Sequence, residues 1–202
     1  MADEQWCIAQ ALRGNQRAFT ELVERYQTPV YNLCHRMLGN APEAEDAAQE
    51  TFVRVYKHLA DYNAEQKLSS WVLAIASHYC IDRLRRRRIT WLSLEDVLPM
   101  PAEIHDTARP EETAVEHESN AEVQDLLQEL PPEYRLVITL RYWQDLSYAE
   151  IAQIVDSTES AVKSRLHRAR RVMAQQILSQ GKLEALPCQV PQGKRVIDNA
   201  VL

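Results

Sequence analysis

Glycine is scarce in this chain of 202 residues, which contains only four. Gly14, Gly39, Gly181 and Gly193 lie far apart, so they cannot form either common type of glycine-rich phosphate-binding loop. So few glycines, with little strand-like alternation of apolar and polar residues, predict an all-helical (all-α) chain. No run of about 18 apolar residues is present, and the N-terminus is polar and acidic rather than signal-like. We therefore expect a cytoplasmic protein without membrane insertion.

Cysteine is also scarce, and the four cysteines form no CxxC pair. They are Cys7, Cys34, Cys80 and Cys188. The neighbours Cys34-His35 and His78-Tyr79-Cys80 lack the spacing of a zinc site, so we expect reduced, mostly buried thiols. No paired carboxylates and no nucleophile with a nearby base stand out. We expect no catalytic residue, no metal and no cofactor, which argues against an enzyme such as a helical hydrolase.

Charge is distributed unevenly along the chain, whose formal net charge is −6. Residues 1–94 hold 12 bases and 11 acids, residues 95–133 hold 12 acids and one base, and residues 134–178 hold 7 bases and 4 acids. The first part of this acidic stretch, residues 95–118, contains three prolines and few apolar residues, which is typical of a flexible linker. We predict two small helical domains, 1–94 and 119–178, joined by an acidic linker, 95–118. The tail 179–202 has no clear helical period, and we assign it no role.

Apolar residues at helical spacing predict four helices in the first domain. Pro29 separates the first two, Gly39 fits the C-terminal cap of the second, and Pro42 opens the third. Ser69 or Ser70 can cap the fourth, which runs into the sequence DRLRRRR.

The fourth helix combines aromatic residues with a basic end. Four consecutive arginines point about 100° apart on a helix, so they cannot share one face. Trp71 and Tyr79 beside such a cluster fit stacking on unpaired bases together with phosphate neutralisation. The alternative is a solvated helix end with Trp71 in the core.

The second domain contains the local signals of a helix-turn-helix. Ser119 with Glu122, and Ser147 with Glu150, have the spacing of capping boxes. The second box opens a short helix, which a tight turn at 156–158 separates from a longer basic helix at about 159–178.

The longer helix has two distinct faces when it is unrolled at 100° per residue. Val162, Leu166, Ala169 and Met173 form a narrow apolar stripe. Small polar and basic residues lie on the other side: Ser160, Lys163, Ser164, His167 and Arg171. In a recognition helix the N-terminal half meets base edges, and residues further along meet phosphates.

Two blocks of sequence resemble a known family. "LPPEYRLVITLRYWQDLSYAEIAQIVDSTESAVKSRLHRAR" is similar to region 4 of extracytoplasmic-function (ECF) sigma factors, and "DAAQETFVRVYKHL" followed by "SSWVLAIASHYCIDRLRRRR" is similar to their region 2. The resemblance implies a bacterial transcription initiation factor that binds the β′ clamp and β flap of core RNA polymerase and promoter DNA. An anti-sigma factor is a possible further partner.

The resemblance also implies roles for individual residues. Candidate polymerase contacts are Asp46, Gln49, Glu50 and Phe52. Candidates for reading and opening the minus-ten element are Trp71, His78, Arg83, Arg85, Arg86, Arg87 and Arg88. Candidates for the minus-thirty-five element are Lys163, Ser164, His167 and Arg168, and the polar face of the unrolled helix adds Ser160 and Arg171. His78 departs from the family, which commonly has Asn there, and Asp156 stands where Gly is frequent.

Alternatives remain open. A stand-alone helix-turn-helix regulator would explain the second domain and leave "DAAQETFVRVY" unexplained, whereas an interaction-only protein would not need a basic recognition face. The acidic linker either mimics RNA along the polymerase's RNA path or serves solubility.

Overall fold

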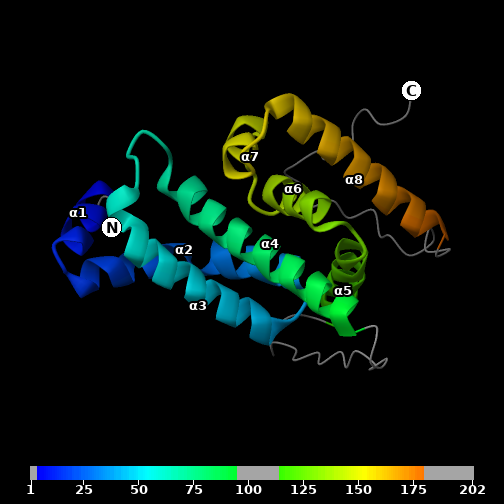
Figure 1. Ribbon diagram of the computed structural model, residues 1–202, viewed down its shortest axis with the longest axis horizontal. Helices are drawn as coiled ribbons and strands as arrows, with labels where there is room; N and C mark the ends of the chain where they lie inside the picture. The colour runs from blue at the N-terminus through cyan, green and yellow to red at the C-terminus, as the bar shows by residue number, and fades with distance from the viewer. Residues whose placement is uncertain (1–3, 95–113, 180–202) are drawn as a thin grey trace.

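The computed structural model describes residues 4–94 and 114–179, and within them all regular secondary structure is helical, as predicted (Figure 1). The helices are α1 (Glu4–Leu12), α2 (Gln16–Leu38), α3 (Ala41–His58), α4 (Leu68–Leu94), α5 (Ala114–Gln128), α6 (Pro132–Tyr142), α7 (Tyr148–Ile154) and α8 (Glu159–Ser179), with a 3-10 turn at Leu59–Asp61. No helix in these ranges is long and apolar enough to cross a membrane. The same ranges contain no cluster of His, Cys, Asp and Glu that could hold a metal ion. The predicted linker lies mostly, and the tail almost wholly, outside the described residues.

Local signals set the ends of the first helices. The Asn15 side chain accepts hydrogen bonds from the first turn of α2, and the Asn40 side chain accepts one from the Glu43 N–H at 2.9 Å at the start of α3. Gly39 ends α2 in the left-handed conformation (φ 90°), as predicted. An alanine Cβ at Gly39 would lie 2.7 Å from the Gln128 amide carbon, so glycine also permits the close approach of α5.

Three predictions about the helix boundaries are wrong. Pro29 does not separate two helices, because α2 runs straight through it. An internal proline costs about 3 kcal/mol, and a continuous buried face that includes Tyr26 and Val30 offsets this cost. Ser69 and Ser70 do not cap α4, which begins at Leu68.

Ser119 is not an N-cap either, since α5 begins at Ala114 and already includes it. Alanine and glutamate are strong helix formers, and together they extend the helix in front of the serine. The second predicted capping box is confirmed: the Ser147 side chain accepts from the Glu150 N–H, and the Glu150 carboxylate accepts from the Ser147 N–H at 2.8 Å.

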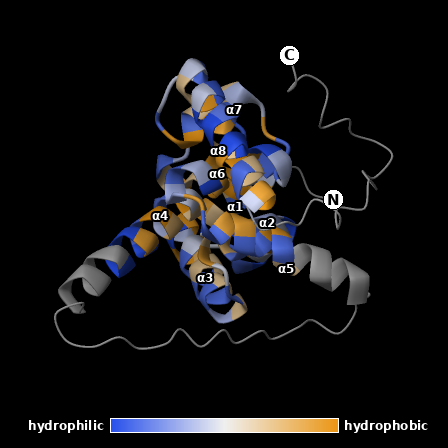
Figure 2. Ribbon diagram, turned by 90° about the vertical axis from the view of Figure 1, so that its right-hand side faces the viewer, coloured by the Kyte–Doolittle hydropathy of each residue, from blue (hydrophilic) through white to orange (hydrophobic). Residues whose placement is uncertain are grey.

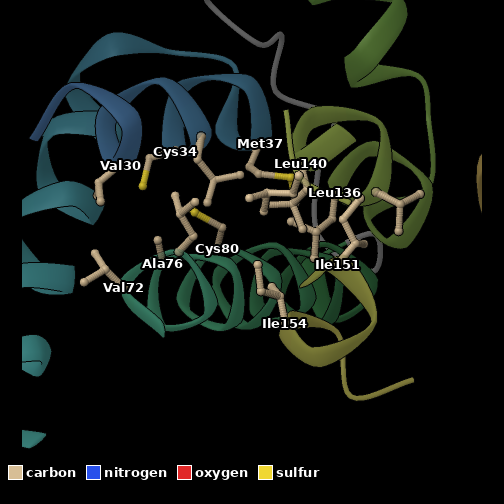
Figure 3. Packing of buried hydrophobic residues seen from close by; sticks show 14 of the residues in the cluster. Val30, Cys34, Met37, Val72, Ala76, Cys80, Leu136, Leu140, Ile151 and Ile154 are labelled. Atoms are coloured by element: carbon tan, nitrogen blue, oxygen red, sulfur yellow. The ribbon is translucent and has the colours of Figure 1, made fainter. Parts of the chain in front are cut away.

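The hydrophobic core is continuous across the molecule. In Figure 3, Val30, Cys34, Val72 and Ala76 of the N-terminal helices lie in one cluster with Leu136, Leu140, Ile151 and Ile154 of the C-terminal helices. Helix α4 packs against α2 and α3 and also against α6 and α7 (Figure 1). Cys7, Cys34 and Cys80 are free and buried, as predicted. The contact with Cys34 and burial raise the pKa of Cys80, so its thiol is not a reactive thiolate.

Candidate nucleic-acid interface

Helices α7 and α8 form a helix-turn-helix. The turn between them is stabilised by the Ser157 N–H, which donates to the Ala152 carbonyl at 2.9 Å. Asp156 adopts a positive φ of 46°, which a short polar side chain tolerates better than most. Thr158 then caps α8, because its Oγ1 accepts from the Ala161 N–H at 3.2 Å. These local bonds fix the direction in which α8 leaves the turn.

The first half of α8 presents its polar residues to solvent. Val162, Leu166 and Ala169 are buried against the other C-terminal helices. All six residues expected at the minus-thirty-five element are exposed: Ser160, Lys163, Ser164, His167, Arg168 and Arg171. The structure therefore brings this predicted set together on one exposed side of one helix.

Tyr148 is a residue that sequence reasoning missed at this surface. Its ring lies 5.4 Å from the Lys163 ammonium and 5.2 Å from the Arg141 guanidinium. Both distances allow a cation–π interaction. The Tyr148 ring therefore lies beside the Lys163 side chain of α8. An aromatic residue directly after the Ser147 cap is the signal that could have identified it.

Residues 82–87 of α4 are mostly hydrophilic (Figure 2), but their arginines divide into two groups. Arg87 pairs with Glu43 of α3, and Arg83 lies 3.9 Å from the Glu43 carboxylate and 3.8 Å from that of Asp46. Arg85 lies on another face, with its side chain 68% exposed and its nearest acid, Asp82, at 4.0 Å. Arg86 is exposed as well, and the side chain of Arg88 lies outside the described part of the chain.

The remaining minus-ten candidates lie further back on α4. Trp71 is half-buried, with its ring 5.3 Å from that of Tyr62, and His78 is exposed. The Arg54 guanidinium lies 4.8 Å from the centre of the Tyr79 ring and covers one of its faces. Trp71 is therefore partly a core residue, and Tyr79 has one occupied face.

Helix α3 carries the expected polymerase contacts. Asp46 and Gln49 are exposed, Glu50 pairs with Arg54 at 2.8 Å, and Phe52 packs half-buried against the core. Two large apolar residues that sequence reasoning missed accompany them: Val53 is 44% and Tyr56 51% exposed. Apolar residues at positions that face solvent on an amphipathic helix are the signal that could have found them.

Glu43 is another missed residue, because it is the acid that holds Arg83 and Arg87. It lies in the first turn of α3, where a carboxylate is favoured by the helix dipole. It also connects α3 to α4, so the candidate polymerase surface and the candidate minus-ten surface are joined by ion pairs.

Comparison with known proteins supports a common origin over both halves. Residues 22–89 match the protein family described as Sigma-70 region 2, and residues 120–173 match Sigma-70, region 4. The chain is 37% identical over 176 residues to the ECF RNA polymerase sigma factor SigW of Bacillus subtilis, covering 84% of this chain and 94% of that protein.

Two solved structures share its fold. CnrH in complex with the cytosolic domain of CnrY is similar with a TM-score of 0.64 and 25% identity, over 88% of this chain and 99% of that one. The sigma factor RpoE in complex with the anti-sigma factor NepR from Bartonella quintana has a TM-score of 0.64 at 20% identity, over 80% of this chain and 96% of that one.

Proposed function

The chain belongs to the extracytoplasmic-function (ECF) sigma factors of the sigma-70 family, and from this membership we propose how its helices share the recognition of a promoter. As an ECF sigma factor it directs RNA polymerase to promoters through regions 2 and 4, and it is an initiation factor rather than an enzyme. The alternative of a stand-alone regulator leaves the match to region 2 unexplained.

Helix α8 is the proposed reader of the minus-thirty-five element. This assignment depends on the amphipathic character of α8. Val162 and Leu166 are buried in the core, whereas Lys163 and His167 are exposed on the opposite face of its N-terminal half. Side chains in that half reach base edges in the major groove, whereas Arg171 lies two turns beyond Lys163 and meets phosphate.

Helix α4 is the proposed reader of the minus-ten element. His78, Arg85 and Arg86 are exposed and can meet unpaired bases and phosphates. Arg83 and Arg87 hold α4 against α3 through Glu43, so their proposed contribution to DNA binding is smaller.

Helix α3 is the proposed docking site for the β′ clamp of core polymerase, through Asp46, Gln49, Glu50 and Phe52. The C-terminal domain, proposed as 119–178, would meet the β flap. An acidic, flexible linker at 95–118 would connect it to the N-terminal domain, 1–94. We place the protein in the cytoplasm, where transcription occurs, and propose an anti-sigma partner because similar sigma factors were solved in such complexes.

The test is run-off transcription with core polymerase on promoters whose upstream element is varied one base at a time. Lys163→Ala should lower initiation on the preferred element by about 1–3 kcal/mol and relax the choice at one base position. Arg171→Ala should weaken all variants about equally and reduce the salt slope by roughly one phosphate contact. The matched control is the exposed Gln175→Ala on the same helix. If Lys163→Ala lowers every variant by the same factor, α8 does not dock in the proposed rotation.

A further inference from the structure

The basic side chains of the recognition helix differ in their contacts. Lys163, in the second turn of α8, is exposed, and its ammonium lies 5.4 Å from the centre of the Tyr148 ring. This distance is within the range of a cation–π interaction. Among the described residues, Lys163 has no carboxylate partner, and no other basic side chain of α8 lies over an aromatic ring. Lys163 is thus set apart by its aromatic neighbour.

The Tyr148 ring is fixed by several contacts. Its backbone directly follows the Ser147 cap, where the Ser147–Glu150 capping box sets the start of α7. The ring is half-buried and packs against the core. The Arg141 guanidinium lies 5.2 Å from the ring centre and donates to the Leu146 carbonyl at 2.8 Å, so it connects the ring to the segment before α7. The ring is therefore a rigid platform beside the exposed side of α8.

A lysine that reads a base benefits from such a platform. Its charge stands at the end of a flexible stem of four carbons, and ordering this stem on DNA costs conformational entropy. A contact that is already made in the free protein reduces the cost that remains at the moment of binding. An ordered ammonium also favours one acceptor over its neighbours, which is what base recognition requires.

An aromatic partner orients a cation without cancelling its charge. A carboxylate partner offsets the positive charge and occupies the donors, as Glu43 does for Arg87 on α4. The tyrosine ring carries no formal charge, so the Lys163 ammonium keeps its attraction to DNA and offers N–H donors to it. The Tyr148 contact therefore prepares a cation for DNA, whereas the Glu43 contact holds two helices together.

We propose that Tyr148 is a positioning residue for minus-thirty-five recognition, whose ring holds the Lys163 side chain in the direction that meets a base edge. This inference rests on the proposed reading role of Lys163. The ring face makes the contact, so the phenol hydroxyl is not required for it. Tyr148 therefore acts on the choice of one base and not on the affinity for all promoters.

The experiment compares Tyr148→Leu with Tyr148→Phe in holoenzyme, by run-off transcription on upstream elements varied one base at a time. The measured quantity is the ratio of initiation on preferred and non-preferred bases at the position whose choice Lys163→Ala relaxes. Tyr148→Leu should lower this ratio about two- to fivefold, as expected for a cation–π contact at an exposed site, and leave other positions unchanged. Tyr148→Phe keeps the ring and should retain the ratio. The matched control, Tyr142→Leu at an exposed tyrosine that ends α6, should change no ratio.

A double-mutant cycle separates this contact from other effects of the ring. In the Lys163→Ala background, Tyr148→Leu should change the ratio no further. An equal change with and without Lys163, an equal loss on every promoter variant, or a Tyr148→Phe protein as poor as Tyr148→Leu would overturn the inference and leave the reading role of Lys163 intact. If Lys163→Ala relaxes no position, that reading role is wrong and the inference fails with it.

A measurement on the free wild-type protein covers the case in which Tyr148→Leu does not fold. In nuclear magnetic resonance spectra, the protons on the carbon next to the Lys163 ammonium should lie upfield of those of other exposed lysines, because ring currents shield protons above an aromatic face. Tyr148→Phe should retain this shift. An unshifted signal in the wild type would show that the ring does not restrict Lys163, and would overturn the inference.

Discussion

Arg135→Met should destabilise the protein strongly although it removes a buried charge. Its guanidinium has no carboxylate partner in the described structure, and its bonds go to the carbonyls of Met37, Gln128 and Leu130 and to the Gln128 side-chain oxygen. These carbonyls lie at or just beyond the C-terminal ends of α2 and α5, where the helix dipole favours a cation. Methionine keeps most of the volume and removes every donor.

The loss of stability in Arg135→Met is the difference between the hydrogen bonds that are lost and the desolvation cost of the buried charge that is relieved. Hydrogen bonds to a charged group contribute about 1.5–3 kcal/mol each, and the three carbonyls would be left without this donor while the Gln128 amide can turn to solvent. Against this, burial lowers the pKa of Arg135 from 12.5 to about 10, which at about 1.36 kcal/mol per unit corresponds to a desolvation cost of roughly 3 kcal/mol. The bonds outweigh this cost, and we expect a net loss of about 3 kcal/mol.

Urea unfolding followed by circular dichroism measures this loss. With a slope of about 2 kcal/mol per molar, the midpoint should fall by roughly 1.5 M. The matched control is Arg141→Met on the same helix, which removes one carbonyl contact, to Leu146 at 2.8 Å, and the cation–π contact with Tyr148, and should cost about 1–2 kcal/mol. An Arg135→Met protein as stable as wild type, or more stable, would show that desolvation dominates and that the carbonyl contacts do not hold α2.

Two further predictions concern ion pairs. Contacts with Lys67 and the Ser147 cap lower the pKa of Glu150 from 4.5 to about 2, so this stability is present above about pH 4.5 and is lost as the pH falls toward 2. Because Lys67 is 73% exposed, we expect these contacts to contribute only about 1–2 kcal/mol to the free energy of unfolding. In urea titrations the wild type should be more stable than Glu150→Gln at neutral pH, and this difference should disappear at low pH. Arg87→Ala should lower the melting temperature by a few degrees, because it leaves Glu43 without its closest partner. Arg85→Ala should leave the melting temperature unchanged and weaken promoter binding by holoenzyme with a smaller salt slope; the reverse pattern would contradict the division of the arginine run.

The helix-turn-helix was predictable because its signals are local. The Ser147 capping box, the short turn and the apolar stripe through Val162 and Leu166 all lie within about 25 residues, and each is set by neighbours in sequence. The cap at Gly39 was predictable for the same reason, since the left-handed conformation at a helix end favours glycine.

The wrong boundaries share a tertiary cause. Pro29 is a strong helix breaker in isolation, yet α2 remains one helix because both halves bury the same face against α3 and α4. Ser70 has the composition of a cap, but burial of its side chain within α4 excludes that role. Local residue propensities predicted where a helix can begin, but tertiary packing determined where α2 and α4 actually begin and end.

The arginine run of α4 shows a similar limit to what the sequence alone can predict about the candidate site. The sequence indicates that the arginines cannot share one face, but it does not say which side faces a neighbour. Glu43 lies 40 residues before Arg83, so no local pattern connects them. Only the packing of α3 on α4 shows that Arg83 and Arg87 stabilise the domain while Arg85 points to solvent.

The chemistry of the interdomain contact also determines how salt should act. Apolar side chains of α6 and neutral amide or carbonyl groups contribute to it, and the Lys67–Glu150 ion pair lies at its edge, where the lysine side chain is 73% exposed. Salt screens exposed charges and leaves buried apolar contacts largely unchanged, so added salt should not disturb the packing between the two halves. Promoter binding, in contrast, releases counterions from phosphates and weakens steeply with salt. A steep salt dependence of promoter binding would therefore report on DNA contacts and not on a change in the packing between the two halves.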